Sequence, residues 1–126
     1  AVSPPNYETI GPIAIQSLAT LHLDIVVLGA NGVDPRFGVT TTTEQEAAVG
    51  RAFAERSDQV VIAADHSKLN RNSLFQMLEW NQVDYLATDG ESVSVIAGWA
   101  LQAEPLITYD DAVFYHLHSE PFTRPE

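Results

Sequence analysis

A chain of 126 residues with 45% hydrophobic residues is long enough for one globular domain with a single core. Its formal net charge of −11 at pH 7 argues against direct binding to nucleic acid, because phosphate backbones require a basic surface. No apolar run approaches the roughly 20 residues of a membrane helix, and the absence of cysteine excludes disulfides and thiolate metal sites.

The first third of the chain predicts an extended lead-in, a helix and a buried strand. Pro4 and Pro5 oppose regular pairing over residues 1–8, although this segment could still supply a partial strand. Gly11-Pro12 begins a helix whose apolar side carries Ile13, Leu18 and Leu21. Leu23–Leu28 is a short, β-branched run that predicts a buried strand, and Gly29–Thr42 is expected to be a loop.

A second helix and strand complete a βαβ unit. Thr43 is a good N-cap, and Glu46 three residues later fits a capping box, so a helix is predicted to about Arg56 with Ala47, Val49, Ala52 and Phe53 inward. Ser57-Asp58 is expected to be a turn, followed by a buried strand over Gln59–Ala64. Two strands separated by such a helix predict a parallel pair with a right-handed crossover.

The remaining chain continues the alternation of strands and helices. Strands are predicted at Leu74–Leu78, Asp84–Thr88 and Pro105–Thr108, a short turn or helix at Trp80–Gln82, and a helix from about Ser92 to Gln102. The tail from Asp110 to Glu126 is expected to be an edge strand or a poorly ordered end. The pattern predicts one α/β domain over residues 1–126 with a mainly parallel, three-layer sheet flanked by helices.

Polar clusters follow the first two predicted strands, at Gly29–Glu46 and at Ala64–Lys68, and in open α/β sheets such strand ends bind ligands. Gly29–Asp34 is either a ligand loop, with Asn31, Gly32 and Asp34 near hydroxyl groups, or a simple turn. Gly38–Thr43 leads into a helix N-terminus suited to phosphate, or is only an N-cap with spare threonines. Glu46 is either a capping-box partner or a group that faces the ligand.

The basic residues are unevenly placed, since five of the six lie between positions 36 and 71. Lys68, the only lysine, follows the second strand and could reach a cleft, although exposure is the default for lysine. His66 could titrate near neutrality, and His22 is expected to be structural. His116 and His118 would share a strand face but make only a weak metal pattern, so no metal site, cofactor or catalytic set is predicted.

Taken together, the strand ends resemble the C-terminal sensor domain of DeoR-type transcriptional repressors. The resemblance covers roughly residues 10–108, and its matching segments are Asp24–Asp34, Phe37–Thr41, Glu46–Phe53, Val60–Leu69 and Val83–Asp89. It implies a fold related to ribose-5-phosphate isomerase and CoA transferases, with a phosphorylated sugar at the strand ends. It also implies that the winged helix-turn-helix and the first phosphate loop are missing before Ala1, so that the domain is incomplete.

Carried over residue by residue, the resemblance implies ligand contacts near Asn31, Asp34 and Glu46 and at Lys68. Together with Gly32, Gly38, Thr40 and Thr41 of the two loops, these residues make up the predicted ligand set. In the isomerase pattern an aspartate stands where this chain has Asn31, and a glycine-rich loop stands where it has Gly38 and threonines. Both departures argue for retained binding without catalysis.

Three functions follow as hypotheses. The leading one is a cytoplasmic effector-binding and oligomerising domain, which meets DNA only through an absent helix-turn-helix and has no membrane partner. The second is an isomerase-like enzyme with Glu46 as base and Lys68 as electrostatic stabiliser. The third is a dimerisation module with a degenerate pocket.

Overall fold

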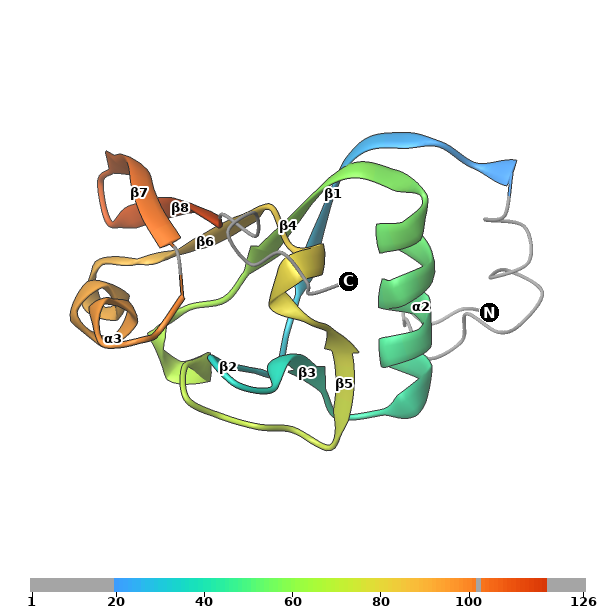
Figure 1. Cartoon of the computed structure of the whole chain (residues 1–126), viewed down its shortest axis with the longest axis horizontal. Helices are drawn as coiled ribbons and strands as arrows, with labels where there is room; N and C mark the ends of the chain where they lie inside the picture. The colour runs from blue at the N-terminus through green and yellow to red at the C-terminus, as the bar shows by residue number, and fades with distance from the viewer. Residues whose placement is uncertain (1–19, 102, 118–126) are drawn as a thin grey trace, which may run out of the picture.

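The computed structural model describes residues 20–101 and 103–117 (Figure 1). A five-stranded sheet has the order β1-β4-β6-β8-β7, and a three-stranded sheet has the order β2-β3-β5. The larger sheet contains β1 (Leu23–Gly29), β4 (Ser57–Ala63), β6 (Tyr85–Asp89), β7 (Ala103–Tyr109) and β8 (Ala112–Leu117). The smaller sheet contains β2 (Gly32–Asp34), β3 (Gly38–Thr41) and β5 (Phe75–Leu78).

Helix α2 (Glu44–Glu55) connects β3 to β4 and confirms the predicted helix. Thr43 is its N-cap, and its hydroxyl oxygen accepts a hydrogen bond from the Glu46 N–H at 3.1 Å. Of the four residues expected to point inward, Ala47 and Val49 are buried, and Ala52 and Phe53 are half-buried. Gly50 was not expected there and is also buried, against Met77. Strands β1 and β4 pair in parallel as predicted, but β4 begins at Ser57, so the expected Ser57-Asp58 turn is wrong.

The predicted loop over residues 29–42 is instead mostly a β-hairpin. β2 and β3 pair antiparallel, with Val33 opposite Val39. The Asp34 carboxylate accepts hydrogen bonds from the Arg36 and Phe37 N–H groups, which closes the turn. Gly38 has φ +80, a backbone conformation that favours glycine, and it starts the returning strand.

The larger sheet is mixed rather than mainly parallel. β6 continues the parallel pairing beside β4, but β8 runs antiparallel to β6 and β7 antiparallel to β8. The predicted strand at Leu74–Leu78 exists as β5 but belongs to the smaller sheet. The predicted helix from Ser92 is only five residues long, α3 (Val93–Ala97), preceded by a 3-10 turn at Gly90–Ser92. Trp80–Gln82 forms a 3-10 turn, consistent with the expected short turn or helix.

The tail supplies an interior strand, because β8 lies between β6 and β7. β1, predicted as a buried strand, instead lies at one sheet edge, with Val27 62% exposed. The predicted lead-in, the residues of the first helix before Thr20, and the tail after Leu117 lie outside the described residues, as does His118.

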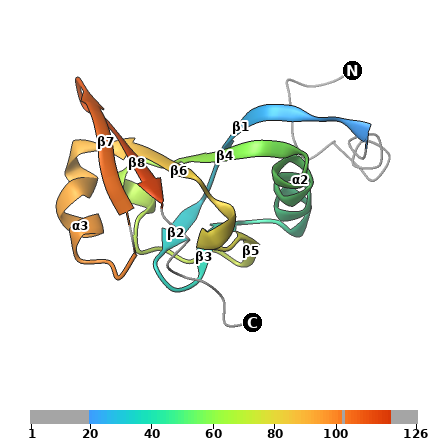
Figure 2. The same cartoon turned by 45° about the horizontal axis from the view of Figure 1, so that its top comes forward.

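The core lies between the two sheets and α2, as Figure 2 shows with the smaller sheet beneath the larger one. Its most buried large side chains belong to β2, β3, β4, β5 and β6: Val33, Val39, Ile62, Leu78 and Leu86. Burying such side chains contributes roughly 1.5–3 kcal/mol each relative to exposure. The chain is therefore an α/β domain with a mixed sheet. The helices of the described part lie on the face of the larger sheet that points toward the smaller sheet (Figure 1).

Candidate functional site

A cavity of about 500 Å³ opens between β1, the hairpin and α2. Its lining is mainly apolar, from β1, α2 and Met77 of β5. Three of the predicted ligand residues line it, namely Asn31, Thr41 and Glu46. The structure therefore brings together part of the set expected from sequence, on three different elements. A mostly apolar wall with a few polar groups is the usual composition of a small-molecule site.

Glu46 is the most informative residue of this cavity. Its Oε1 atom is buried and has no hydrogen-bond partner among the described residues. The backbone N–H of Glu46 does bond the Thr43 hydroxyl, so the N-cap is formed. A buried carboxylate oxygen without a donor is costly in a folded chain, by roughly 1–3 kcal/mol or more. A bound ligand with a hydroxyl or other donor would relieve that cost.

The other two polar residues are held by the hairpin. The Asn31 Oδ1 atom accepts a hydrogen bond from the Thr42 N–H at 3.0 Å, and the Thr41 hydroxyl donates to the Thr43 carbonyl at 3.1 Å. These bonds fix Asn31 and Thr41 beside the first turn of α2. The Asn31 amide NH₂ group remains able to donate to a ligand, because its oxygen is the atom that is bonded.

The cavity runs along the edge of β1 that pairs with no strand of the described part. Its lining includes five consecutive residues, Val26 to Ala30. Side chains alternate between the two faces of a strand, so five consecutive residues can share a cavity only if it lies along the strand edge. β1 pairs with β4 on one side, and the described residues provide no strand on the other side. Backbone polar groups at this edge can therefore also meet a ligand.

Five of the predicted ligand residues do not line the cavity, and four of these have structural contacts in or near the hairpin instead. The Thr40 hydroxyl donates to the Gly32 carbonyl and accepts from the Ser73 N–H. A side chain at Gly32 would meet the Arg71 carbonyl at 2.4 Å, and one at Gly38 would meet the Leu78 carbonyl at 2.4 Å. The Asp34 carboxylate closes the hairpin turn. These residues build the hairpin on which the cavity depends.

The loop after β4 meets strand β2, which follows β1 in the chain. Val33 forms a bridge with Leu69, and the Val33 carbonyl accepts from the Asn70 N–H at 2.8 Å. Lys68 is part of the 3-10 turn His66–Lys68 in this loop, but it does not line the cavity. The described part of the cavity wall contains no lysine or arginine.

A separate polar cluster lies at the end of β6. His66 Nδ1 is 2.8 Å from the Asp89 carboxylate, and its Nε2 is 3.2 Å from the Glu91 carboxylate. The hydrogen bond to Asp89 raises the pKa of His66 above its ordinary value. The same bond is the largest cause that lowers the pKa of Asp89, to about 2. His66 thus ties the loop after β4 to the end of β6.

Among the described residues, one group could be arranged around a metal ion. His22, Asp24 and Asp58 have ligand atoms within 4.8 Å of one another and are all exposed. The Asp58 carboxylate lies 3.0 Å from His22 Nε2 and raises the pKa of the imidazole. His116 instead stacks on Tyr85 at 5.1 Å. No metal site is inferred from either histidine.

The sequence predictions missed the apolar part of the cavity. Val49 and Phe53 lie three and seven residues after Glu46 on α2, and all three line the cavity. This spacing places residues on one side of a helix. The helical spacing of these residues therefore indicates that they share one side of α2 with Glu46. The same spacing is equally typical of core packing, so it does not identify a cavity.

Comparison with known proteins adds family evidence to this geometry. Residues 1–90 match the model of the DeoR C terminal sensor domain. The chain is 36% identical over 81 residues to the HTH-type transcriptional regulator GlpR of Haloferax volcanii, and this alignment covers 64% of this chain and 32% of the relative. It is 35% identical over 79 residues to the HTH-type transcriptional repressor GlcR of Bacillus subtilis, covering 63% and 30%. The glycerol-3-phosphate regulon repressor of Escherichia coli K12 is 31% identical over 80 residues, covering 64% and 32%.

The chain aligns with about a third of the length of these relatives. Their names are those of transcriptional regulators and repressors. In the described part of the chain, no helix is long and apolar enough to cross a membrane. The family model matches well over half of the 126 residues. The chain belongs to the family of DeoR C-terminal sensor domains.

Proposed function

We propose that this chain is the effector-binding and oligomerising domain of a DeoR-type transcriptional repressor, and that its effector is a phosphorylated sugar or polyol. Support comes from the family match and from a relative whose name refers to a glycerol-3-phosphate regulon. The names of two relatives refer to a helix-turn-helix, and DNA contact is assigned to a domain of that type. These 126 residues carry a net charge of −11, which opposes binding to the phosphates of DNA.

The observation that carries this proposal is the unpartnered Glu46 oxygen in the cavity. Glu46 accepts a hydrogen bond from a ligand hydroxyl, and Asn31 supplies a donor on the same wall. The apolar residues of β1 and α2 face the carbon atoms of the ligand. Sugar and polyol ligands have this combination of hydroxyl groups and C–H surface.

The phosphate group is assigned to a position outside the described cavity wall. That wall contains no lysine or arginine, and the first turn of α2 carries Glu44 and Glu46. Two carboxylates there oppose a phosphate, even though a helix N-terminus alone would favour one. The cavity is therefore proposed to hold the hydroxylated end of the ligand.

Effector binding would regulate by biasing the arrangement of subunits. A ligand shifts an equilibrium only by its difference in affinity for the two states. The shape of the cavity depends on the relative positions of β1, the hairpin and α2. A ligand that contacts all three therefore favours one arrangement of these elements. DNA affinity and effector affinity would then be linked reciprocally.

The test is titration calorimetry of the 126-residue chain with glycerol 3-phosphate and ribose 5-phosphate, followed by Glu46→Gln. The substitution keeps size and polarity but weakens acceptance from hydroxyl groups, since charge-assisted hydrogen bonds are the stronger ones. We expect at least a tenfold loss of affinity. Glu44→Gln, in the same helical turn but outside the cavity wall, serves as the matched control. Equal affinity of wild type and Glu46→Gln would refute the assignment of Glu46.

An isomerase-like reaction is the second candidate, because a buried carboxylate in a cavity could also act as a base. The relatives named as repressors favour binding instead. An aldose–ketose interconversion assay on ribose 5-phosphate separates the two. Turnover that disappears in Glu46→Gln would establish the enzyme.

A further inference from the structure

Met77 of β5 reaches the cavity from an irregular position in its strand. Thr40 of β3 pairs with Gln76 of β5. The preceding residue, Val39, pairs with Leu78, so β5 has one residue more than β3 between the two pairs. That extra residue is Met77, and a β-bulge of this kind can turn the side chain of its extra residue in a new direction. Met77 and Leu78 are accordingly both buried, although neighbours in a regular strand point to opposite faces.

A glycine of α2 leaves the space that the Met77 side chain occupies. Gly50 is buried and lines the cavity together with Met77. A Cβ atom at position 50 would overlap the Met77 Sδ atom and lie 2.8 Å from its Cγ atom. Glycine in a helix interior is less favourable than alanine, so this position weakens α2 on its own. The close approach of the thioether gives the glycine a structural reason.

The backbones on either side of this contact are tied together. Arg51 Nη1 donates a hydrogen bond to the Gln76 carbonyl at 2.8 Å, and these two residues are the chain neighbours of Gly50 and Met77. β5 runs alongside α2 in Figure 1. A methionine side chain is unbranched and has several rotatable bonds, so it adapts its shape more readily than other apolar side chains. The adjustable part of this wall is therefore the thioether.

The thioether lies close to the unpartnered carboxylate along the helix. Glu46 and Gly50 are four residues apart, which places them on the same side of α2 and one turn from each other. Met77 packs against Gly50, so it is also about one helical turn from Glu46. A ligand whose hydroxyl group meets Glu46 and which extends along α2 therefore meets Met77 next.

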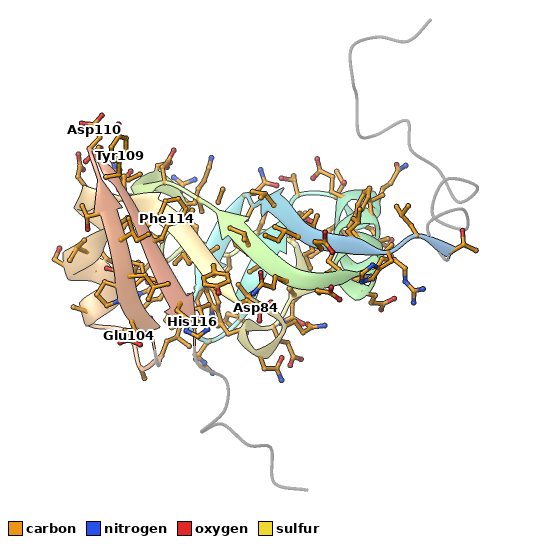
Figure 3. The ribbon with its side chains drawn as sticks, turned by 90° about the horizontal axis from the view of Figure 1, so that it is seen from above. Asp84, Glu104, Tyr109, Asp110, Phe114 and His116 are labelled. Carbon is orange, nitrogen blue, oxygen red and sulfur yellow. The ribbon has the colours of Figure 1, made fainter. Side chains whose placement is uncertain are left out.

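A second hollow does not lengthen this cavity. It is lined by Tyr109 and neighbouring residues and shares no lining residue with the cavity. Figure 3 labels Tyr109 at the end of the larger sheet that lies farthest from α2. A larger ligand gains no room there, so the length that fits beyond Glu46 depends on the walls of the cavity itself.

We infer that Met77 determines the size of the ligand that the cavity accepts, and that Gly50 provides the space for its thioether. The inference rests on the proposed function, because it concerns the specificity of the same cavity. Glu46 meets a hydroxyl group, which sugars and polyols of every length possess. An apolar wall does discriminate by length, since one methylene group in a hydrophobic pocket changes selectivity by roughly 10- to 200-fold.

The experiment compares the affinities of glucose 6-phosphate and glycerol 3-phosphate by titration calorimetry of the 126-residue chain. Met77→Ala removes the thioether and should shift the ratio of the two affinities at least tenfold toward the larger ligand. Gly50→Ala displaces the thioether into the cavity and should shift the ratio at least tenfold toward the smaller one. Opposite shifts identify a size limit, because a general loss of stability would weaken the binding of both ligands together.

Leu74→Ala is the matched control for these variants. Leu74 directly precedes β5, is 78% exposed and does not line the cavity. The ratio of the two affinities should change less than twofold in this variant.

A second measurement needs no variant and so does not depend on whether one folds. Met77 is the only methionine, so a chain labelled with ¹³C in its methionine methyl group gives one methyl signal. That signal should shift as ligand is added, with the affinity that calorimetry gives. Binding that leaves the signal in place, or an affinity ratio unchanged in Met77→Ala and Gly50→Ala, would overturn the inference while the proposed function stands. If neither ligand binds to the wild-type chain, the proposed function fails and the inference fails with it.

Discussion

At the scale of single residues, some of the predicted ligand residues build the site, and one of them has a side-chain oxygen that is available to a ligand. Contacts within the protein involve Thr40, Asp34 and the two hairpin glycines, Gly32 and Gly38. Within the described part of the chain, Glu46 has a buried oxygen without a hydrogen-bond partner. In the proposed function, a donor group of the ligand meets that oxygen.

Replacing Glu46 by leucine should stabilise the ligand-free protein while abolishing effector binding. The substitution removes a buried carboxylate with no hydrogen-bond donor, so the free energy of unfolding should rise by about 1 kcal/mol. Chemical denaturation measures it. Glu44→Leu, at an exposed position in the same turn, should change stability by less than about 0.5 kcal/mol. A clear loss of stability in Glu46→Leu would mean that the carboxylate has a partner in the folded protein.

The pair formed by His66 and Asp89 should make stability depend on pH. The raised pKa of His66 gives a contribution that is complete below about 6.5 and is lost as pH rises through its folded value. The lowered pKa of Asp89, about 2, gives one that is present above about 4 and is lost as pH falls toward 2. The pair should therefore stabilise most between about pH 4 and 6.5.

Thermal unfolding between pH 5 and 8 tests this expectation, with His66→Gln as the variant. His22 has a raised pKa of its own from Asp58, so both proteins should carry His22→Gln. The fall in melting temperature above pH 6.5 should be smaller in His66→Gln. Parallel pH profiles for the two proteins would rule out a folded-state ion pair between His66 and Asp89.

At the scale of elements, the sequence predicted secondary structure better than pairing. The helix beginning after Thr43 was predictable because cap and helix period agree. The β2–β3 hairpin was missed because its strands are three and four residues long and its glycines signal a loop. β8 was uncertain because nothing local in residues 112–117 shows that they insert between β6 and β7. Such long-range pairing is set by packing of the whole sheet.

The site was predictable only in part for the same reason. Asn31, Thr41 and Glu46 were predicted and do line one cavity, whereas Lys68 was predicted and does not line it. Proximity in sequence to a strand end does not fix the direction of a side chain. The contribution of Met77 depends on β5 joining the smaller sheet, which no local pattern indicates.

A substitution in the hairpin tests whether its glycines are structural. Gly38→Ala places a Cβ atom 2.4 Å from the Leu78 carbonyl at a residue with φ +80, so the loss of stability should be about 2 kcal/mol or more. Gly29→Ala is the control, because a Cβ atom added at Gly29 would have no neighbour within 4 Å. Urea unfolding of both variants gives the comparison. Similar stabilities for the two would show that Gly38 is not constrained by the turn.

At the scale of the whole molecule, charge repulsion opposes the burial of the apolar core. A net charge of −11 on 126 residues causes self-repulsion, which destabilises the compact state. Salt screens the repulsion over about 10 Å at 0.1 M but leaves apolar contacts intact. Folding should therefore be strengthened by salt.

Raising NaCl from about 20 to about 300 mM should increase the melting temperature, because the Debye length becomes shorter than the spacing of many surface charges. Scanning calorimetry measures the effect. KCl should act equally, since screening depends on ionic strength. A melting temperature that falls as salt rises would indicate that ion pairs stabilise the folded protein more than charge repulsion destabilises it.

A thermal-shift comparison of matched ligands measures whether this DeoR-type sensor domain recognises a phosphorylated sugar or polyol. The 126-residue chain is heated with glycerol 3-phosphate, ribose 5-phosphate and glucose 6-phosphate, each beside its unphosphorylated form. A ligand at 100 times its dissociation constant stabilises the folded state by about 2.7 kcal/mol. We predict that at least one phosphorylated member raises the melting temperature by several degrees, that its unphosphorylated form does so less, and that Glu46→Gln removes the shift. Equal shifts for phosphorylated and unphosphorylated forms, or shifts that Glu46→Gln leaves intact, would contradict the account.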